Sequence, residues 1–347
     1  MTAFKPPCRD MNKITMVVFH NEYLRTMLKV NFKTALIGMV FLGAFSMVTT
    51  SCSSDDDETE STEQPTDGRK LRQLTITDVP ITRATLKDNT TSLGATWSAG
   101  DEATYFNLSS FSTTKIDRGT LTANSSTTTS SFTGGVVCGQ QDQIALIYPS
   151  VSIDETSAST RGTFTINLSG QAGTLADIAT NYHYVYGIGE VASVTETTAT
   201  ATISPMKSLL AVCRFTFKDG SNTIPVKTLS IGYGYNDASY GYSETGYPLT
   251  GTVNPFKKVN NVTTIVPIED ISVTADSPSD PRLTINFGDE TSDVVYAALF
   301  PVSGQLFHFT VTNDDGTYTG TATATLKAGK FYNVPPLKLT KKLPSNN

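Results

Sequence analysis

The sequence predicts an all-β protein, because strand-like runs recur along most of it. Short runs rich in Val, Ile, Thr, Tyr and Phe alternate with turn-forming segments rich in Gly, Pro, Asn, Asp and Ser. The runs recur about every ten residues, which is typical of β-sandwiches. Within residues 164–168 and 283–287 every second residue is apolar, so one strand face lies in a core and the other in water. Helical periodicity is scarce, and one short helix is expected at residues 175–182.

An export signal precedes the β region. Lys29 and Lys33 stand before an apolar run of 14 residues, 35–48, and small residues follow it up to Cys52. A basic start, an apolar core and small residues at the exit are typical of a secretory signal. The run is too short for a membrane span, which takes about 20 residues. Met27 stands directly before this signal, so we expect the true start there.

The place of Cys52, directly after the small residues, resembles a bacterial lipobox, in which the signal is cut before the cysteine and the cysteine is acylated. Thr49 departs from this pattern, because a branched aliphatic residue is usual three positions before the cysteine. The alternative is a plain secretory signal with an incidental cysteine. Ser-Ser-Asp-Asp-Asp at residues 53–57 resembles the acidic tag of surface lipoproteins of the Bacteroidetes phylum. We therefore expect a leader at residues 1–51 and a lipid anchor at Cys52 in the outer membrane.

Composition divides the rest of the chain into a tether and two domains. Residues 52–70 are acidic and rich in Ser, Thr and Glu, and they predict a flexible tether. Within the β region beyond it, residues 190–204 are rich in Thr and nearly free of long apolar side chains. We place a domain boundary near Thr195. The expected sandwiches are residues 71–194 and residues 195–347.

The clearest expected strands share β-branched and aromatic residues between turn signals. They are residues 73–79, 143–148, 162–168, 210–217, 228–233, 263–268, 282–287, 294–300 and 307–313. Asn-Asp-Asp-Gly-Thr at residues 313–317 indicates a tight hairpin turn, because Asp-Gly supplies the positive-φ positions that such a turn needs. Trp97 is the only tryptophan, and we expect it in the core of the first domain.

No residue pattern indicates catalysis, a metal or a cofactor. After Cys52 the chain holds two histidines, His183 and His308, and neither has a partner at metal-ligand spacing. The chain contains no Gly-x-Ser-x-Gly elbow, no phosphate-binding glycine loop and no Cys-x-x-Cys. The aspartates of residues 313–317 lack the spacing and closing glutamate of an EF-hand. We therefore expect no enzyme, no metal and no cofactor.

Charge and cysteine content limit the partners further. The chain holds 26 Lys and Arg against 32 Asp and Glu. Residues 1–51 carry six of the basic and two of the acidic ones, so 20 basic and 30 acidic residues remain after the signal, without a basic cluster. Nucleic-acid binding is therefore disfavoured. Cys138 and Cys213 lie in apolar runs of different domains, and we expect two buried free thiols, with a disulfide as the alternative.

A tyrosine-rich segment, residues 231–251, is a candidate ligand patch. Exposed tyrosines stack on sugars or supply interface area at low entropic cost, because their rings are stiff and half polar. The alternative is a hairpin whose tyrosines cover the face of a sheet. The candidate residues are Tyr233, Tyr235, Tyr240, Tyr242 and Tyr247.

Five short motifs come one after another along the chain. They are ITRA at 81–84, ATWSAGD at 95–101, IYP at 147–149, ALFP at 298–301 and LKAGKFYNV at 326–334. In this order they resemble the fimbrillin family of Bacteroidetes, the Mfa-like or type V pilins and their relatives. The first two motifs resemble the "TRA … W-x-x-G-D" opening of that family, and the last resembles its closing "L-x-x-G-K-x-Y" strand.

The resemblance implies two transthyretin-like β-sandwich domains in a surface pilin or adhesin. In that family a lipoprotein precursor reaches the outer membrane, a trypsin-like protease cuts after an arginine, and an N-terminal strand leaves. A strand from a neighbouring subunit then fills the groove. An unpaired edge beside an apolar groove is unstable until another strand completes it.

By this resemblance, the strand that would leave is residues 73–79. The first candidate for the cut is Arg83, with Arg72 and Arg69 as runners-up; the alternative is that Arg83 is an ordinary exposed residue. Only residues 338–347 come after the closing strand, which is short for the donor extension of stalk pilins and implies a tip or accessory subunit.

The implied partners are other pilin subunits, the outer membrane through the lipid anchor, and a host glycan or protein. The alternative function is that of a monomeric glycan-binding surface lipoprotein that uses the tyrosine-rich segment.

Overall fold

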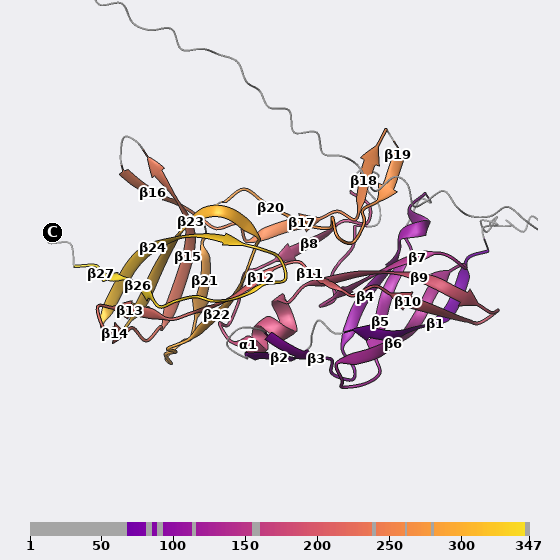
Figure 1. Ribbon diagram of the computed structural model, residues 1–347, viewed down its shortest axis with the longest axis horizontal. Helices are drawn as coiled ribbons and strands as arrows, with labels where there is room; N and C mark the ends of the chain where they lie inside the picture. The colour runs from indigo at the N-terminus through magenta and orange to yellow at the C-terminus, as the bar shows by residue number, and fades with distance from the viewer. Residues whose placement is uncertain are drawn as a thin grey trace, which may run out of the picture. The chain divides into compact units, whose positions relative to one another are not determined.

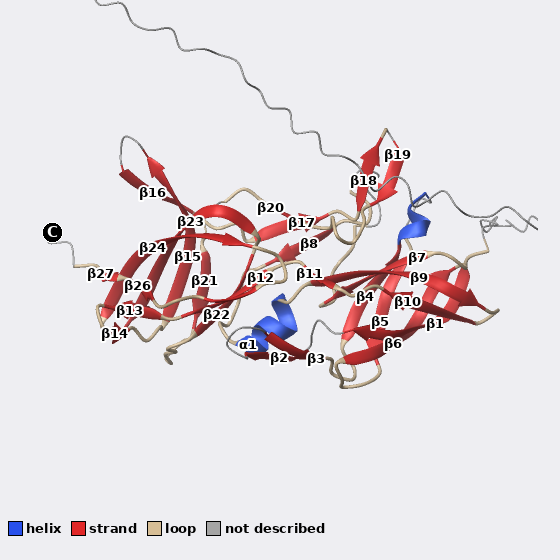
Figure 2. Cartoon of the chain, viewed as in Figure 1, coloured by secondary structure: helices blue, strands red, loops and turns tan. Residues whose placement is uncertain are grey.

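The protein is built almost entirely of β-strands, as the sequence predicts (Figures 1 and 2). The computed structural model describes residues 68–80, 85–88, 93–112, 116–154, 160–237, 241–260, 262–278 and 281–343. These residues belong to one compact unit, Glu63–Asn347. Helical turns within them are confined to η2 (Leu108–Ser112), α1 (Leu175–Asp177) and η3 (Ile178–Tyr182). The last two form the short helix expected at residues 175–182. No helix of the described ranges has the length and apolar character that a membrane crossing needs.

The first sheet has eight strands in the order β10-β1-β6-β5-β4-β7-β9-β11. Because β10 pairs with β1 on one side and with β9 on the other, seven of these strands form a closed ring. The strands are β1 (Lys70–Pro80), β4 (Glu102–Asn107), β5 (Arg118–Ala123), β6 (Thr129–Cys138), β7 (Gln143–Tyr148), β9 (Val185–Val194), β10 (Thr198–Ile203) and β11 (Lys207–Ser208).

Trp97 lies in the core of this ring, as expected. Its side chain is 1% exposed. The indole meets Phe132 and Tyr148 edge-on, with ring centroids 4.9 and 5.2 Å apart. Such perpendicular aromatic contacts add to the apolar area that the ring buries.

The second half of the chain forms a sandwich of facing sheets. One layer has the order β16-β15-β23-β24-β27, with β21 also paired to β15, and the other layer contains β22-β12-β25 and β14-β13-β26. Phe215 and Phe217 from the second layer pack against Phe309 of the first, with centroids 5.5 and 6.1 Å apart. The bounds are β12 (Ala211–Phe215), β13 (Phe217–Asp219), β14 (Asn222–Thr223), β15 (Thr228–Asp237), β16 (Gly241–Thr245), β21 (Leu283–Asn286), β22 (Val295–Leu299), β23 (Val302–Asn313), β24 (Gly316–Leu326), β25 (Phe331–Asn333), β26 (Leu337–Lys338) and β27 (Thr340–Lys341).

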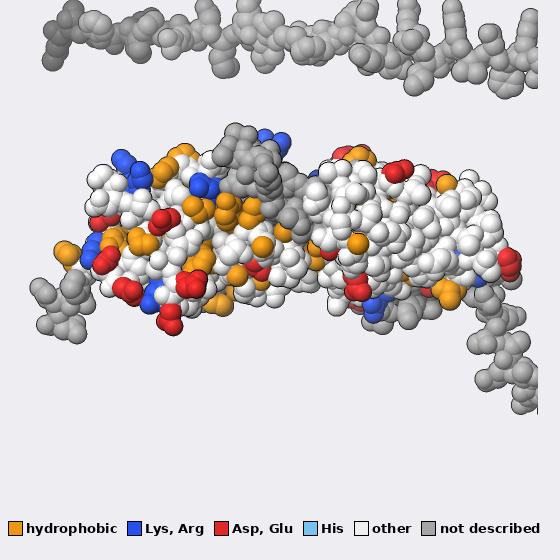
Figure 3. All heavy atoms as spheres, turned by 90° about the horizontal axis from the view of Figure 1, so that it is seen from below, with side chains coloured by type: hydrophobic (Ala, Val, Ile, Leu, Met, Phe, Trp, Pro, Cys, Tyr) orange, Lys and Arg blue, Asp and Glu red, His pale blue; other side chains and the backbone are white. Residues whose placement is uncertain are grey.

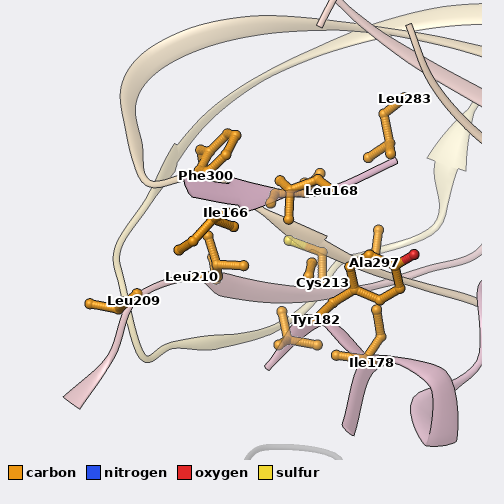
Figure 4. Close-up of a cluster of buried hydrophobic side chains, with 14 of the residues drawn as sticks. Ile166, Leu168, Ile178, Tyr182, Leu209, Leu210, Cys213, Leu283, Ala297 and Phe300 are labelled. Carbon is orange, nitrogen blue, oxygen red and sulfur yellow. The ribbon is translucent and has the colours of Figure 1, made fainter. Parts of the chain in front are cut away.

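A small third sheet joins distant parts of the sequence. β8 (Phe164–Asn167) pairs with β17 (Thr250–Val253), and β17 pairs in turn with β20 (Val273–Ala275). Figure 4 shows Ile166 and Leu168 from the β8 segment gathered with Ile178 and Tyr182 of the helical turn, beside buried residues of β12 and β22. Two separate hairpins complete the fold, β2 (Thr85–Asp88) with β3 (Leu93–Thr96), and β18 (Phe256–Val259) with β19 (Val262–Ile265).

A cut near Thr195 falls inside the first sheet. β10 and β11 come after this residue and still pair with β9, whereas β8 precedes it and pairs with β17 of the second half. The Thr-rich residues 190–204 therefore include strand rather than forming a linker. Ala199 and Ala201 of β10 are 3% and 2% exposed, so small side chains face the core where sequence alone shows no long apolar residue.

One face of the molecule is largely uncharged. On the face shown in Figure 3, most atoms belong neither to charged nor to hydrophobic side chains, and charges of both signs are scattered. Cys138 and Cys213 are buried and free, which confirms the expectation of two unbridged thiols. Burial raises the pKa of both thiols, so they are protonated at neutral pH and act as small apolar side chains.

Candidate functional site: strand β1 and the groove it fills

β1 is the first described strand (Figure 1). It is one of the seven strands of the ring and lies between β10 and β6, so it is not an edge strand. It pairs antiparallel with β6 from Lys70 to Pro80, with a register shift between Ile76 and Val79. On its other side it pairs in parallel with β10 from Gln73 to Thr77. β1 therefore closes the ring, and β6 and β10 would each lose a neighbour without it.

The inward face of β1 is apolar. Leu74, Ile76 and Val79 are 0% exposed, whereas Gln73 and Thr77 face solvent. Full burial of an aliphatic side chain of this size contributes roughly 1.5–3 kcal/mol. Leu74 and Ile76 follow the two-residue period of a strand, and the register shift before Val79 places two exposed residues, Thr77 and Asp78, between Ile76 and Val79. The slot that holds β1 is consequently an apolar groove with a hydrogen-bonding backbone on each side.

Trp97 holds the far end of β1. Its Nε1–H donates to the Val79 carbonyl oxygen at 3.3 Å. The same indole packs on Phe132 of β6. One side chain thus connects the end of β1 to its neighbouring strand and to the core.

A buried carboxylate holds the chain just before β1. Arg69 donates twice to Asp142, from Nε to Oδ2 at 2.7 Å and from Nη2 to Oδ1 at 2.8 Å. The Asp142 side chain is 6% exposed, and its Oδ2 also accepts from Asn107 Nδ2 at 2.7 Å and from the Gly139 N–H at 2.8 Å. Burial by itself would raise the pKa of Asp142, but the hydrogen bonds from Arg69, Gly139 and Asn107 hold this pKa below its usual value.

Replacing Asp142 with asparagine is expected to lower the free energy of unfolding by about 1–3 kcal/mol at neutral pH, because Arg69 loses its charged partner. The carboxyl has a lower pKa folded than unfolded, so its contribution is complete above the unfolded pKa of about 3.9 and is lost as the pH falls through the folded pKa. Urea denaturation of both proteins at several pH values measures this. A gap between wild type and Asp142→Asn that stays constant down to about pH 2 would contradict the assignment.

Arg72 is held by backbone carbonyl oxygens, whereas Arg69 is held by a carboxylate. The residue is 6% exposed, and its Nε donates to the Thr195 carbonyl oxygen at 2.8 Å while Nη1 donates to the Cys138 carbonyl oxygen. A protease that recognises arginine must take the side chain into its own pocket. In the folded chain the side chains of Arg72 and Arg69 are both held by internal contacts. Arg83 and Cys52 lie outside the described residues.

The five tyrosines of the candidate ligand patch do not share one surface. Tyr247 is fully buried, and its hydroxyl oxygen accepts from the Phe300 N–H at 3.0 Å. Tyr233 is 8% exposed and packs on Tyr247 with centroids 5.1 Å apart. These two rings belong to the core, which corrects their placement in a surface patch.

Two of the other three tyrosines, Tyr235 and Tyr242, lie on the paired strands β15 and β16. Tyr235 is 48% exposed, because β15 continues past the part of the sandwich that covers Tyr233. Tyr242 lies on β16 opposite Asn236, with its side chain outside the described part. Tyr240 is not among the described residues.

The sequence carries no signal for the role of Asp142. It stands in Gly139–Asp142, which has the composition of any solvated turn. Its partners Arg69 and Asn107 are 73 and 35 positions away. Only the folded chain brings them together.

The comparisons with known proteins give distant likenesses. No protein-family model and no curated protein matches the chain. A solved structure of a candidate cell adhesion protein from Bacteroides ovatus ATCC 8483 has 14% identity and a TM-score of 0.41, and the match covers 79% of this chain and 96% of that one. A second such protein, from Bacteroides eggerthii DSM 20697, has 15% identity and a TM-score of 0.34 over 76% and 85%. The tip fimbrial protein Mfa3 from Porphyromonas gingivalis has 9% identity and a TM-score of 0.31 over 73% and 81%. All three TM-scores are low, so the fold is inferred from this chain's own strand pairing.

Proposed function

We propose that this chain is a fimbrial or adhesin subunit of the cell surface that assembles by strand addition. In this proposal β1 leaves after proteolysis, and a strand of a neighbouring subunit takes its place. The observation that carries the proposal is the position of β1. It is the N-terminal strand of the described fold, and it also closes the ring between β6 and β10.

The physical reason lies in the groove that β1 would leave behind. Its departure exposes the backbone edges of β6 and β10 and the pocket that holds Leu74 and Ile76. An incoming strand with apolar residues at alternate positions restores both sets of backbone hydrogen bonds and fills the groove. An open groove is a strong acceptor because its edges are otherwise unpaired.

Three arginines are candidate places for the cut, and β1 runs from Lys70 to Pro80. A cut after Arg69 would leave all of β1 on the body of the protein, and a cut after Arg72 would divide it. A cut after Arg83 would separate the whole strand from the body of the protein. We therefore keep Arg83 as the processing site.

The leader completes the proposal. Acylation of Cys52 would anchor the precursor in the outer membrane, and in this proposal the subunit takes a tip or accessory place in a fimbrium. Its partners would then be other pilin subunits. Mass spectrometry of the protein from its native membrane reports acylation of the precursor and its processing together, and an unmodified Cys52 in the uncut precursor would remove the anchor.

Replacing Arg83 with lysine is expected to abolish processing by an arginine-specific protease while keeping the positive charge. Wild type should lose its N-terminal segment and form ladders that resist sodium dodecyl sulfate. Arg83→Lys should keep its full mass and stay monomeric on the same gel. The matched control is Arg118→Lys on the exposed side of β5, which should behave as wild type. Ladders formed by Arg83→Lys would refute the site, and an uncut wild type without ladders would refute the proposed assembly.

A further inference from the structure

An open cleft of about 670 Å³ lies beside β8, away from β1. Its walls are the loop after β7, the turn at residues 160–163, β8 itself, Tyr184, and Thr252 of β17. Its volume lies within the range of roughly 300–1,000 Å³ that is usual for small-ligand sites. None of its described lining residues belongs to β1, so the departure of β1 would remove no residue of this lining.

Internal hydrogen bonds hold the loop after β7 in place. The buried Thr104 hydroxyl accepts from the Val151 N–H at 2.9 Å and lies 2.7 Å from the Ser150 hydroxyl. Further along, the Asp154 N–H donates to the Thr163 carbonyl oxygen at 2.9 Å. The Gly162 N–H returns a bond to the Asp154 carbonyl oxygen at 2.7 Å. The walls are therefore formed before any ligand arrives, which lowers the entropic cost of binding.

Hydroxyl groups dominate the polar part of the lining. They come from Ser150, Ser152, Thr160, Thr163, Thr165 and Thr252. Thr165 and Thr252 face one another in register across β8 and β17. A hydroxyl both donates and accepts, so it can match a ligand group that also does both.

The rest of the lining is one carboxylate and an apolar surface. Asp154 accepts from the Thr160 hydroxyl. Phe164 is 2% exposed and stacks on Tyr186 with centroids 6.3 Å apart, so it forms part of a rigid floor. Tyr184 is half-buried and is the aromatic ring of the lining that remains partly open.

This lining excludes several ligand classes. Of the described residues that line the cleft none is Lys, Arg or His, and Arg161 of the turn at residues 160–163 is not among them, so the described lining gives an anionic ligand no cationic partner. Asp154 is the only carboxylate among the described residues of the lining, and one carboxylate is too few for a hard cation. A peptide strand would have to pair with the edge of β8 that faces away from β17. The beginning of that edge is already occupied, because Ile153 forms a β-bridge with Phe164 and the Thr163 carbonyl oxygen accepts from the Asp154 N–H.

We propose that this cleft binds a neutral oligosaccharide. Sugar hydroxyls donate and accept in the same way as the serine and threonine hydroxyls that face them. Asp154 adds an acceptor, and the Tyr184 ring offers a stiff apolar surface to the face of a pyranose. The inference goes beyond the proposed assembly, because it assigns a ligand class to the single chain and does not depend on strand addition.

The test is binding of the full mature chain to an array of neutral trisaccharides, with sialylated and sulfated ones beside them, and then calorimetry on the best neutral ligand. Tyr184→Ala and the pair Thr165→Ala with Thr252→Ala are each expected to weaken binding at least tenfold. The pair removes two hydroxyls of the cleft without touching its floor. Its matched control is Thr321→Ala with Thr323→Ala on exposed positions of β24, which should bind as wild type. Thermal unfolding checks that each variant folds.

Three outcomes would overturn the inference. Wild type could retain no neutral sugar, or it could prefer the anionic sugars. Binding could also survive in both cleft variants and be lost in Tyr235→Ala, which would place the ligand on the tyrosine-rich hairpin. Ladder formation by strand addition is read in a separate assay, so failure here leaves the proposed assembly standing.

Discussion

Replacing Trp97 with alanine is expected to lower the free energy of unfolding by about 3–5 kcal/mol, the usual range for deleting a large aromatic side chain from a core. Trp97 is 1% exposed and meets Phe132 and Tyr148 edge-on. Removing the indole leaves a cavity between two rings that cannot both move to fill it. Urea denaturation monitored by far-ultraviolet circular dichroism measures the change.

A second variant separates the packing of the indole from its hydrogen bond, and a third is a control. Trp97→Phe keeps an aromatic ring but removes the hydrogen bond to the Val79 carbonyl oxygen, so it should cost less than Trp97→Ala while still loosening the end of β1. Hydrogen exchange at the backbone amides of β1 reports that loosening. Tyr235→Ala, at an exposed aromatic, is the control and should change stability by less than about 0.5 kcal/mol. A similarly small effect of Trp97→Ala would place the indole outside the stabilising core.

Locking β1 to β6 with a disulfide is expected to abolish assembly completely under oxidising conditions. Thr75 and Thr133 are direct partners in the antiparallel pair of β1 and β6. Thr75 lies between the buried Leu74 and Ile76, and Thr133 follows the buried Phe132, so cysteines at these two positions point away from the core. A bridge there keeps β1 in its groove even after the chain is cut beyond Pro80. Ladders resistant to sodium dodecyl sulfate should disappear and return once the bridge is reduced.

The control for the lock is a bridge between direct partners on two antiparallel strands that stay in the protein. Glu102 and Thr122 are direct partners in β4 and β5, and a disulfide at that pair should leave ladder formation unchanged. Cys138 and Cys213 are buried, so neither competes for the new thiols. Ladders that persist with β1 locked would show that the groove of β1 is not the place where subunits join.

The sequence was a good guide to local structure because strand signals are local. The expected strand at residues 143–148 is β7 itself, and the hairpin expected at residues 313–317 joins β23 to β24, with Asn313 opposite Gly316. Its two turn residues are Asp314 and Asp315, and neither has a positive φ, so the role expected for Asp-Gly in this turn was wrong. Trp97, the only tryptophan of the chain, lies in a core as expected. In each case the pattern of a few neighbouring residues determines the outcome.

Pairing between distant strands could not be read from the sequence. β8 pairs with β17 from the second half of the chain, and β1 pairs with β10 across more than a hundred positions. β10 was hidden because its inward residues are Ala199 and Ala201, which add little to an apolar pattern. Tyr233 and Tyr235 lie on the same side of β15 by period, yet only the former is covered by the sandwich.

The two walls of the groove run in opposite directions, since β6 is antiparallel to β1 and β10 is parallel to it. Any guest strand, whichever way it enters, therefore meets one parallel and one antiparallel neighbour. The backbone of the slot has no preferred polarity of its own. Orientation and register must then be read from side chains alone, by which apolar residues of the guest reach the sites now held by Leu74, Ile76 and Val79.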